Sequence, residues 1–346
     1  MSEVGTEVQS YAAIVERRRR RRNARRLTAV GLALTMCATG AIGVRRSLAQ
    51  RLDAVRRDDT LAAVLSPADD RFVNILLVGS DSREGADPND PDFGNVGGTG
   101  DVQGRRSDTL IVMNVERSSG IISLLSIPRD LWVEIGDSGG SDRINTAYRD
   151  GSAVVVRTVQ RALTIPVHHY LEINFQGFKS LVDAVGGVKV CVEHPTRDRN
   201  TGLFIPVGCK NLDGVDALAW ARSRYFEEKV DGAWRMDGTS DIGRGKRQRL
   251  FVALLMKTAI ERTLANPFRA GTVLDGATDA LLVDPALDVV EFASLMRPAA
   301  TGKLRRFSLG TYGDTVGDAS VLRLDSSSAE VLGFFAGTGA APIPTE

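Results

Sequence analysis

Cysteine and histidine are scarce in this chain of 346 residues, with three of each. A structural zinc site usually takes about four Cys or His ligands at short spacings. His194 and Cys191 lie close together in the sequence, but too few other Cys or His residues lie near them to complete such a site. The histidines also lie outside the charged clusters described below. The chain lacks internal repeats and low-complexity bias as well. These absences argue against a zinc protein and against a repetitive or collagen-like chain.

The net charge is close to zero, at +1, but it is unevenly distributed. Residues 1–46 contain ten Arg and three Glu, and without them the totals of 44 basic and 43 acidic residues fall to 34 and 40. A nucleic-acid-binding domain usually carries excess positive charge. The sequence therefore predicts no nucleic-acid partner, with a basic nucleic-acid-binding patch at the N-terminus as the minor alternative.

An uncharged stretch of 18 residues, 27–44, follows eight of these arginines. Its length is near the lower end of the ~17–25 residues that span a bilayer. The excess of arginine on its N-terminal side places the N-terminus in the cytoplasm. We therefore expect a cytoplasmic tail (1–26), a single transmembrane signal-anchor (27–44) in the cell membrane, and an extracytoplasmic remainder. Three glycines weaken the stretch, so a cleaved signal peptide is the alternative.

Cys191 and Cys209 flank a polar segment of 17 residues, which we interpret as a loop. Outside the cytoplasm, an oxidising compartment would allow the two thiols to pair. We predict a disulfide that stabilises the fold by roughly 3 kcal/mol through the unfolded state. Two unrelated buried thiols are the alternative.

Past the anchor, we expect a stalk (45–71), a compact extracytoplasmic domain (72–338) and a tail (339–346). Apolar runs that suit strands alternate with amphipathic segments that suit helices, which predicts an α/β domain with a mixed sheet. Gly and Asp mark loops at 85–104, and 226–239 also reads as a loop. The expected helices are 144–163, 175–185, 212–224 and 244–264, and the expected strands include 74–80, 109–115, 121–127, 131–135, 188–192 and 304–309.

Three apolar runs each abut a paired Asp and Arg in the first half of the domain. Ligands in α/β proteins gather at strand ends, and carboxylates suit Mg²⁺ while guanidinium groups suit phosphate. The second half repeats this chemistry beside two helices. We interpret these clusters as a site for Mg²⁺ and phosphate, with salt-bridge networks as the alternative. The residues are Asp81, Arg83, Arg106, Asp108, Arg129, Asp130, Arg222, Arg224, Asp241, Arg244, Arg247 and Gln248.

In these motifs the sequence resembles the LytR-CpsA-Psr family of bacterial cell-envelope phosphotransferases, in unbroken order from Asn74 to Leu264. The motifs are 77–83 (LVGSDSR), 106–110 (RSDTL), 126–130 (SIPRD), 144–148 (INTAY), 174–178 (NFQGF), 181–188 (LVDAVGGV), 221–224 (ARSR) and 241–248 (DIGRGKRQ).

The resemblance implies an α-β-α sandwich with a central mixed sheet, a hydrophobic pocket for a polyprenyl chain and a charged mouth for its pyrophosphate. The implied reaction transfers a glycopolymer from polyprenyl pyrophosphate to an acceptor hydroxyl, usually on peptidoglycan, through a phosphodiester. By position, Asp81 and Asp108 would coordinate Mg²⁺, and Asp241 would orient the arginines. The pyrophosphate would be held by Arg83, Arg106, Arg129, Arg222, Arg224, Arg244 and Gln248. Asp130 and Arg247 also match motif positions.

Two other functions stay open at this point. The same site would serve a pyrophosphatase that delivers the phosphate to water, and a non-enzymatic envelope sensor or polymer-binding protein is the second alternative. The segment 85–105 is longer than the family usually has, and Arg105 beside Arg106 leaves open which of the two points inward. The sequence names neither the polymer nor the acceptor.

Overall fold

The structure is a computed structural model that describes residues 54–80, 107–238, 240–265, 275, 276, 278, 280–298 and 304–344. For residues 108, 240–242, 263–265, 290 and 293 it describes the backbone only. The described residues all fall in the unit that begins at Ala54. Within these ranges no helix is long and apolar enough to cross a membrane. The expected cytoplasmic tail, 1–26, and the expected anchor, 27–44, lie outside the described residues.

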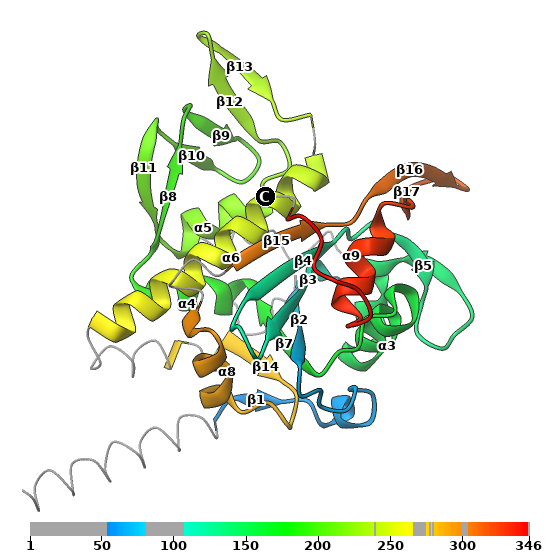
Figure 1. Cartoon of the computed structure of the whole chain (residues 1–346). Helices are drawn as coiled ribbons and strands as arrows, with labels where there is room; N and C mark the ends of the chain where they lie inside the picture. Colours follow the sequence, from blue (N-terminus) through cyan, green and yellow to red (C-terminus); the bar gives the residue numbers. More distant parts are fainter. Residues whose placement is uncertain are drawn as a thin grey trace, which may run out of the picture. The chain divides into compact units, whose positions relative to one another are not determined.

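A seven-stranded mixed sheet forms the centre of the fold (Figure 1), in the order β1 (Arg56–Arg57), β14 (Leu281–Val283), β7 (His169–Asn174), β2 (Phe72–Ser80), β3 (Ser107–Glu116), β4 (Ile122–Ile127) and β15 (Leu304–Ser308). β2 is parallel to β7 and antiparallel to β3. β4 is antiparallel to β3 and parallel to β15. The predicted α/β class with a mixed sheet is therefore confirmed.

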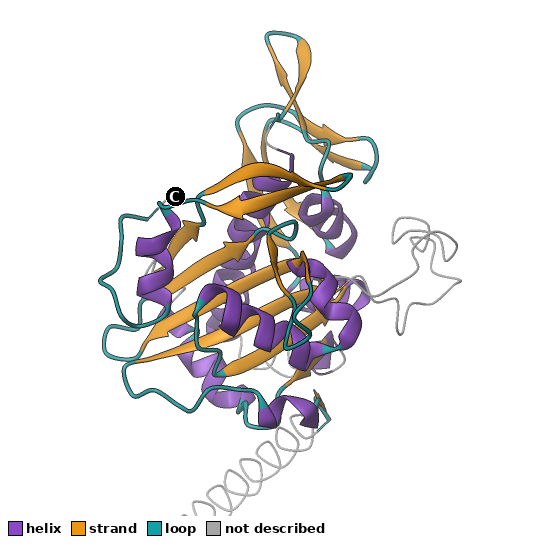
Figure 2. Ribbon diagram, turned by 90° about the vertical axis from the view of Figure 1, so that its right-hand side faces the viewer, coloured by secondary structure: helices purple, strands orange, loops and turns teal. Residues whose placement is uncertain are grey.

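Helices cover both faces of this sheet (Figure 2), and this is why its central strands carry apolar residues on both faces. Asn74 of β2 and Asn114 of β3 interrupt the apolar runs, and the Asn114 side chain donates a hydrogen bond to Asn74 Oδ1 at 2.8 Å. On one face, Leu76 and Val78 belong to a core cluster with residues of α3 (Ser152–Leu163) and α9 (Ser328–Phe335). On the other face, Val73 and Ile75 belong to a cluster against which α6 (Ser240–Ala265) and α8 (Val289–Leu295) pack. Two hairpins, β5–β6 (Trp132–Glu134 and Ser141–Arg143) and β16–β17 (Thr311–Val316 and Ala319–Leu324), complete this part.

A third core cluster joins α6 to α4 (Phe175–Val185), α5 (Gly214–Arg222) and a set of short strands. Phe251 of α6 is buried in this third cluster, whereas Met256 packs against the cluster on the sheet. The helix is therefore apolar on two sides. The short strands are β8 (Val188–Val192) and β11 (Gly208–Leu212), which pair, and a four-stranded sheet of β10 (Leu203–Ile205), β9 (Thr196–Asp198), β12 (Glu227–Val230) and β13 (Ala233–Met236).

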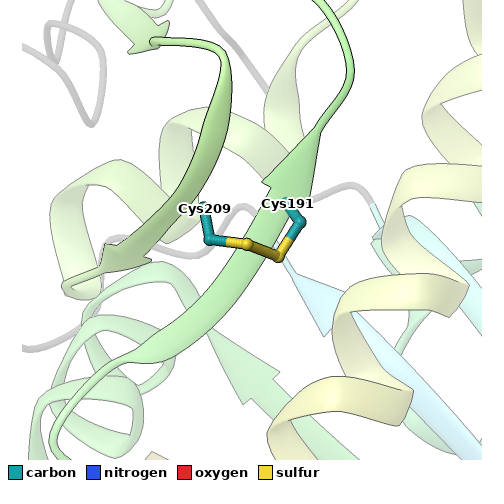
Figure 3. The surroundings of a disulfide bond; sticks show 2 residues. All are labelled: Cys191 and Cys209. Atoms are coloured by element: carbon teal, nitrogen blue, oxygen red, sulfur yellow. A yellow bond between two sulfur atoms is a disulfide. The ribbon is translucent and has the colours of Figure 1, made fainter.

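Cys191 and Cys209 are Cα partners in the antiparallel pair of β8 and β11, and a disulfide bond joins them (Figure 3). The predicted pairing is confirmed. The interpretation of the residues between them as a loop is wrong, because β9 and β10 lie there. Their alternate residues are buried, Leu203 and Ile205 among them, so the strands face the third core cluster although most of the segment is polar.

Three further expectations about single elements are corrected. The segment 226–239 is not a loop but contains the β12–β13 hairpin, which turns at Asp231 and Gly232 with φ values of 52° and 80°. The helix expected from Leu212 begins at Gly214, because the Asp213 side chain accepts a hydrogen bond from the Asp216 amide and caps it there. The helix expected over 144–163 is divided by Gly151, at φ 102°, into a 3-10 helix η2 (Ile144–Asp150) and α3.

The expected stalk, 45–71, is partly incorporated into the folded unit. β1 pairs with β14 at the edge of the main sheet, and it is followed by a 3-10 helix, η1 (Asp59–Ala63). Leu61 is fully buried in the core cluster that contains α3. The apolar residues of Arg45–Val64 are spaced as in a helix. In the described part of this segment, which begins at Ala54, Leu61 contacts the core of the domain.

Candidate functional site

The motif residues of the first half converge on one edge of the central sheet. β2, β4, β7 and β15 run in the same direction, so their C-terminal ends share this edge, and the antiparallel strand β3 begins there. The register aligns Ser80 with Ser107 and with Asn174, and Ser126 with Ser308. The segments that carry Asp81, Asp108 and Arg129 therefore start from neighbouring strand ends, where ligands of open α/β sheets bind.

A β-bulge sits at this edge, at the start of β3. Gly79 pairs with Thr109 and Ser80 pairs with Ser107, so Asp108 is the extra residue between them. Bulges redirect the bulged strand and recur beside active sites. The backbone is therefore irregular at the position that the sequence assigned to a metal ligand. The side chains of Asp108 and Asp241 lie outside the described part of the chain, as do Asp81, Arg83, Arg105 and Arg106.

The turn after β4 holds Arg129 and Asp130 in contact with each other. Arg129 Nε lies 3.3 Å from Asp130 Oδ2, and Arg143 Nε lies 3.6 Å from Asp130 Oδ1. The Asn145 amide donates to the Arg129 carbonyl oxygen at 3.2 Å, so η2 supports the turn from the side. Two guanidinium groups therefore pair with the Asp130 carboxylate. Asn145, in the motif at 144–148, stabilises the turn that carries it.

Arg222 and Arg224 are separated by the end of α5. Arg222 is the last helical residue, and Ser223 leaves the helix with φ −58° and ψ 122°. The guanidinium carbon of Arg222 lies 4.7 Å from the ring centroid of Phe175, the residue that follows the end of β7. This cation–π contact brings the end of α5 to the edge of the sheet. The two arginines therefore need no frayed helix to serve one ligand.

The first turns of α6 hold the end of α5 through two motif side chains. Gln248 Nε2 donates to the Ala221 carbonyl oxygen at 3.0 Å, and Arg247 Nη2 donates to the Ser223 carbonyl oxygen at 2.8 Å. Arg247 also pairs with Asp237 at 3.0 Å, and its guanidinium carbon lies 4.3 Å from the Phe226 ring centroid. Burial lowers the pKa of Arg247, while the Asp237 carboxylate opposes this shift. Arg247 and Gln248 therefore hold the end of α5 in place.

Two more arginines of α6 are buried, Arg244 at 4% and Arg249 at 2% exposure. A Cβ atom added to Gly245 would lie 3.2 Å from Ser126 Oγ and 3.7 Å from Arg249 Nη1. The start of α6 therefore reaches the end of β4, and the second-half cluster joins the first at the same edge. Sequence reasoning placed Arg244 in the site but missed Arg249, whose only signal in the sequence is that it directly follows the motif residues Arg247 and Gln248.

A buried carboxylate, Asp198, was also missed. It ends β9 and is fully buried. Its hydrogen bonds reach the residues that follow α5. Its signal in the sequence was weak, because a three-residue strand in a polar segment gives little periodicity to detect.

Comparisons with known proteins agree on one family. The model of the LytR_cpsA_psr family matches residues 42–332. The probable cell wall biosynthesis protein LcpB of Corynebacterium glutamicum is 37% identical over 224 residues, which are 64% of this chain and 50% of that protein. The polyisoprenyl-teichoic acid–peptidoglycan teichoic acid transferase TagU of Halalkalibacterium halodurans is 37% identical over 236 residues, 67% of each chain. The match thus spans half to two thirds of the length of these relatives.

Solved structures show the same fold. A LytR-Csp2A-Psr enzyme from Actinomyces oris superposes with a TM-score of 0.60 at 22% identity, covering 82% of this chain and 96% of that one. TagT of B. subtilis superposes with a TM-score of 0.57 at 21% identity, covering 82% and 98%.

Proposed function

We propose, because the chain belongs to the LytR_cpsA_psr family, that it is a transferase that moves a glycopolymer from a polyprenyl-pyrophosphate carrier to a peptidoglycan hydroxyl. The observation that carries the proposal is the grouping of arginines at one sheet edge. Arg222 and Arg224 at the end of α5, Arg244 on α6 and Arg129 after β4 come from three separate elements. A planar guanidinium binds phosphate oxygens in a bidentate manner that an ammonium cannot match.

In the proposed reaction, the acceptor hydroxyl attacks the phosphorus attached to the sugar. The P–O bond to the lipid phosphate breaks, and polyprenyl phosphate leaves with the hydroxyl proton, while the glycopolymer gains a phosphodiester. Phosphoryl transfer depends mostly on positioning and on neutralising charge. The arginines bind and orient the pyrophosphate and neutralise its oxygens.

We propose Mg²⁺ as the cofactor. Hard carboxylate oxygens are the ligands that Mg²⁺ prefers, together with substrate phosphates. In the sequence Asp81 directly follows Ser80, the last residue of β2, and Ser80 pairs with Ser107, which directly precedes Asp108. These residue types therefore suit the ion. When bound, the ion would neutralise charge on the phosphate oxygens.

A lipid carrier has support on the α6 side of the sheet. Leu77 and Ile173 are only half-buried although they lie on two neighbouring central strands, and Val252 and Met256 of α6 are half-buried against the same cluster. Apolar side chains between a sheet and its covering helix are usually fully buried. We infer that a polyprenyl chain packs against these half-buried side chains along α6, since the name of the H. halodurans relative includes the word polyisoprenyl.

The proposal extends to location. The uncharged segment 27–44 would anchor the chain in the cell membrane, with the folded unit on the outer side, where peptidoglycan lies. The bond between Cys191 and Cys209 supports this, since disulfides persist in oxidising compartments.

Product analysis tests the transfer. We expect the purified full chain, given a polyprenyl-pyrophosphate-linked glycan and Mg²⁺, to form a phosphodiester-linked product and polyprenyl phosphate only when a peptidoglycan fragment is present. Mass spectrometry of both products is the measurement. Release of inorganic phosphate whatever the acceptor would identify a pyrophosphatase, and binding without turnover at saturating Mg²⁺ would identify a binding protein.

A second test concerns the lipid. We expect polyprenyl phosphate, but not a soluble sugar phosphate, to raise the melting temperature of the delipidated full chain. Met256→Trp should place a bulky ring where the lipid would pack and abolish that rise. The cost to the apo protein should be small, because overpacking costs about 1–3 kcal/mol only where a core is already dense, and Met256 is half-buried.

Met236→Trp is the matched control, since Met236 is 59% exposed on β13, and it should keep the full lipid effect. Equal stabilisation by both ligands, or a lipid effect that survives Met256→Trp, would count against a lipid site along α6.

A further inference from the structure

Asp198 is a buried carboxylate on a strand outside the main sheet. It ends β9, in the four-stranded sheet, and its exposure is 0%. A charged carboxylate is seldom buried unless hydrogen bonds compensate it. Its partners therefore indicate why it is there.

Those partners are three consecutive residues that follow α5. Asp198 Oδ2 accepts from Ser223 Oγ at 2.7 Å, from the Arg224 amide at 3.0 Å and from the Tyr225 amide at 2.9 Å. Oδ1 accepts from the Asn200 amide at 2.9 Å. The three amides can only donate, and the Ser223 hydroxyl donates as well, so this set of partners favours an ionised carboxylate, which only accepts. Burial acts to raise the pKa of Asp198, but the hydrogen bonds outweigh it and hold the pKa below its usual value.

The same turn is held from its other side by α6. Arg247 donates to the Ser223 carbonyl oxygen at 2.8 Å, and its guanidinium packs over Phe226. The Ser223 hydroxyl, the Ser223 carbonyl and the Arg224 amide are thus all fixed by side chains from elements far away in the sequence. The path of the backbone between Arg222 and Arg224 is therefore set by contacts outside α5.

We propose that Asp198 is a positioning residue for the phosphate-binding arginines. By fixing the turn at Ser223–Tyr225, it sets the relative placement of Arg222 and Arg224, so that both guanidinium groups address one pyrophosphate. This inference rests on the proposed function. It assigns a part in substrate binding to the four-stranded sheet, through a residue that touches no substrate itself.

The first test measures binding of inorganic pyrophosphate to the full chain by calorimetry, with melting curves to verify folding. Asp198→Asn replaces one acceptor oxygen by a donor group that faces other donors, and we expect it to weaken pyrophosphate binding at least 10-fold. Asp183→Asn is the matched control, because Asp183 Oδ1 accepts the Gly214 amide at the opposite end of α5. Binding to this control should change less than 2-fold.

A double-mutant cycle separates positioning from general destabilisation. If Asp198 acts through Arg224, then Arg224→Lys should weaken binding strongly in the wild-type background but less than 3-fold in the Asp198→Asn background. Additive losses, or unchanged binding in Asp198→Asn, would overturn the inference. If Asp198→Asn does not fold, Ser223→Ala takes its place in the cycle, with an expected 3-fold loss that disappears beside Arg224→Lys.

The outcome also distinguishes this inference from the proposed function. A wild-type chain that fails to bind pyrophosphate would contradict the proposed function itself. A wild-type chain that binds it, together with an Asp198→Asn variant that binds equally well, would contradict the positioning role of Asp198 only.

Discussion

Arg224→Lys is expected to lower the transfer rate by about 10²-fold or more, on the scale of losing one positioned donor in a transition state. Lysine keeps the positive charge but lacks the planar fork that binds two phosphate oxygens together. Arg222→Lys should lose as much, because the same planar fork is lost. Turnover of each purified full chain, with folding verified by melting curves, is the measurement.

Arg235→Lys is the matched control for these two variants. Arg235 lies on β13, its side chain is 63% exposed, and it pairs with Asp231 at 3.6 Å. Ion pairs at the surface contribute little, so this variant should keep the wild-type rate. Full activity in both Arg222→Lys and Arg224→Lys would contradict their proposed role in binding the pyrophosphate, and of the three arginines proposed from α5 and α6 it would leave Arg244 alone.

Asp108→Asn is expected to reduce the rate by about 10²-fold at low Mg²⁺, and raising Mg²⁺ should restore part of it. An amide oxygen is a weaker ligand for a hard cation than a carboxylate, so a higher concentration compensates for lost affinity. The Arg→Lys variants should show no such recovery, because their defect is not in the metal. A Mg²⁺ titration of turnover for all variants side by side distinguishes the two kinds of defect.

Asp130→Asn provides the neighbouring acidic control. Its carboxylate already pairs with Arg129 and Arg143, so its loss should disturb the turn after β4 without creating a need for more Mg²⁺. Recovery of Asp130→Asn by Mg²⁺, with none for Asp108→Asn, would reassign the metal ligand from the start of β3 to the turn after β4.

The central sheet and its charged edge were predictable because both depend on local patterns. Runs such as Ile75 to Val78 are long and apolar, and the charged motifs directly follow or precede them. The bulge at Asp108 was not predictable, because it depends on the register of two strands joined by a long segment. The role of Asp198 was not predicted for a similar reason, because its hydrogen-bond partners lie about 25 residues away in the sequence and follow another element.

Two errors differ in whether the sequence carried a usable signal. Asp231-Gly232 is a dipeptide typical of tight hairpin turns, and it lies between the strands that were read as a loop. The few apolar residues around it concealed those strands. Leu61 and Val64 were assigned to a stalk because their spacing suits a helix, but spacing does not reveal that the partner of an apolar face is the core of the same domain.

The bond between Cys191 and Cys209 closes a covalent ring, and Asp198 lies inside that ring while Ser223, Arg224 and Tyr225 lie outside it. The four-stranded sheet is accordingly assembled from two topologically different halves. β9 and β10 belong to the ring, and β12 and β13 belong to the chain that follows. A single cut between residues 191 and 209 would therefore leave both fragments covalently attached, and the carboxylate that holds the arginine turn would stay tethered to the rest of the molecule.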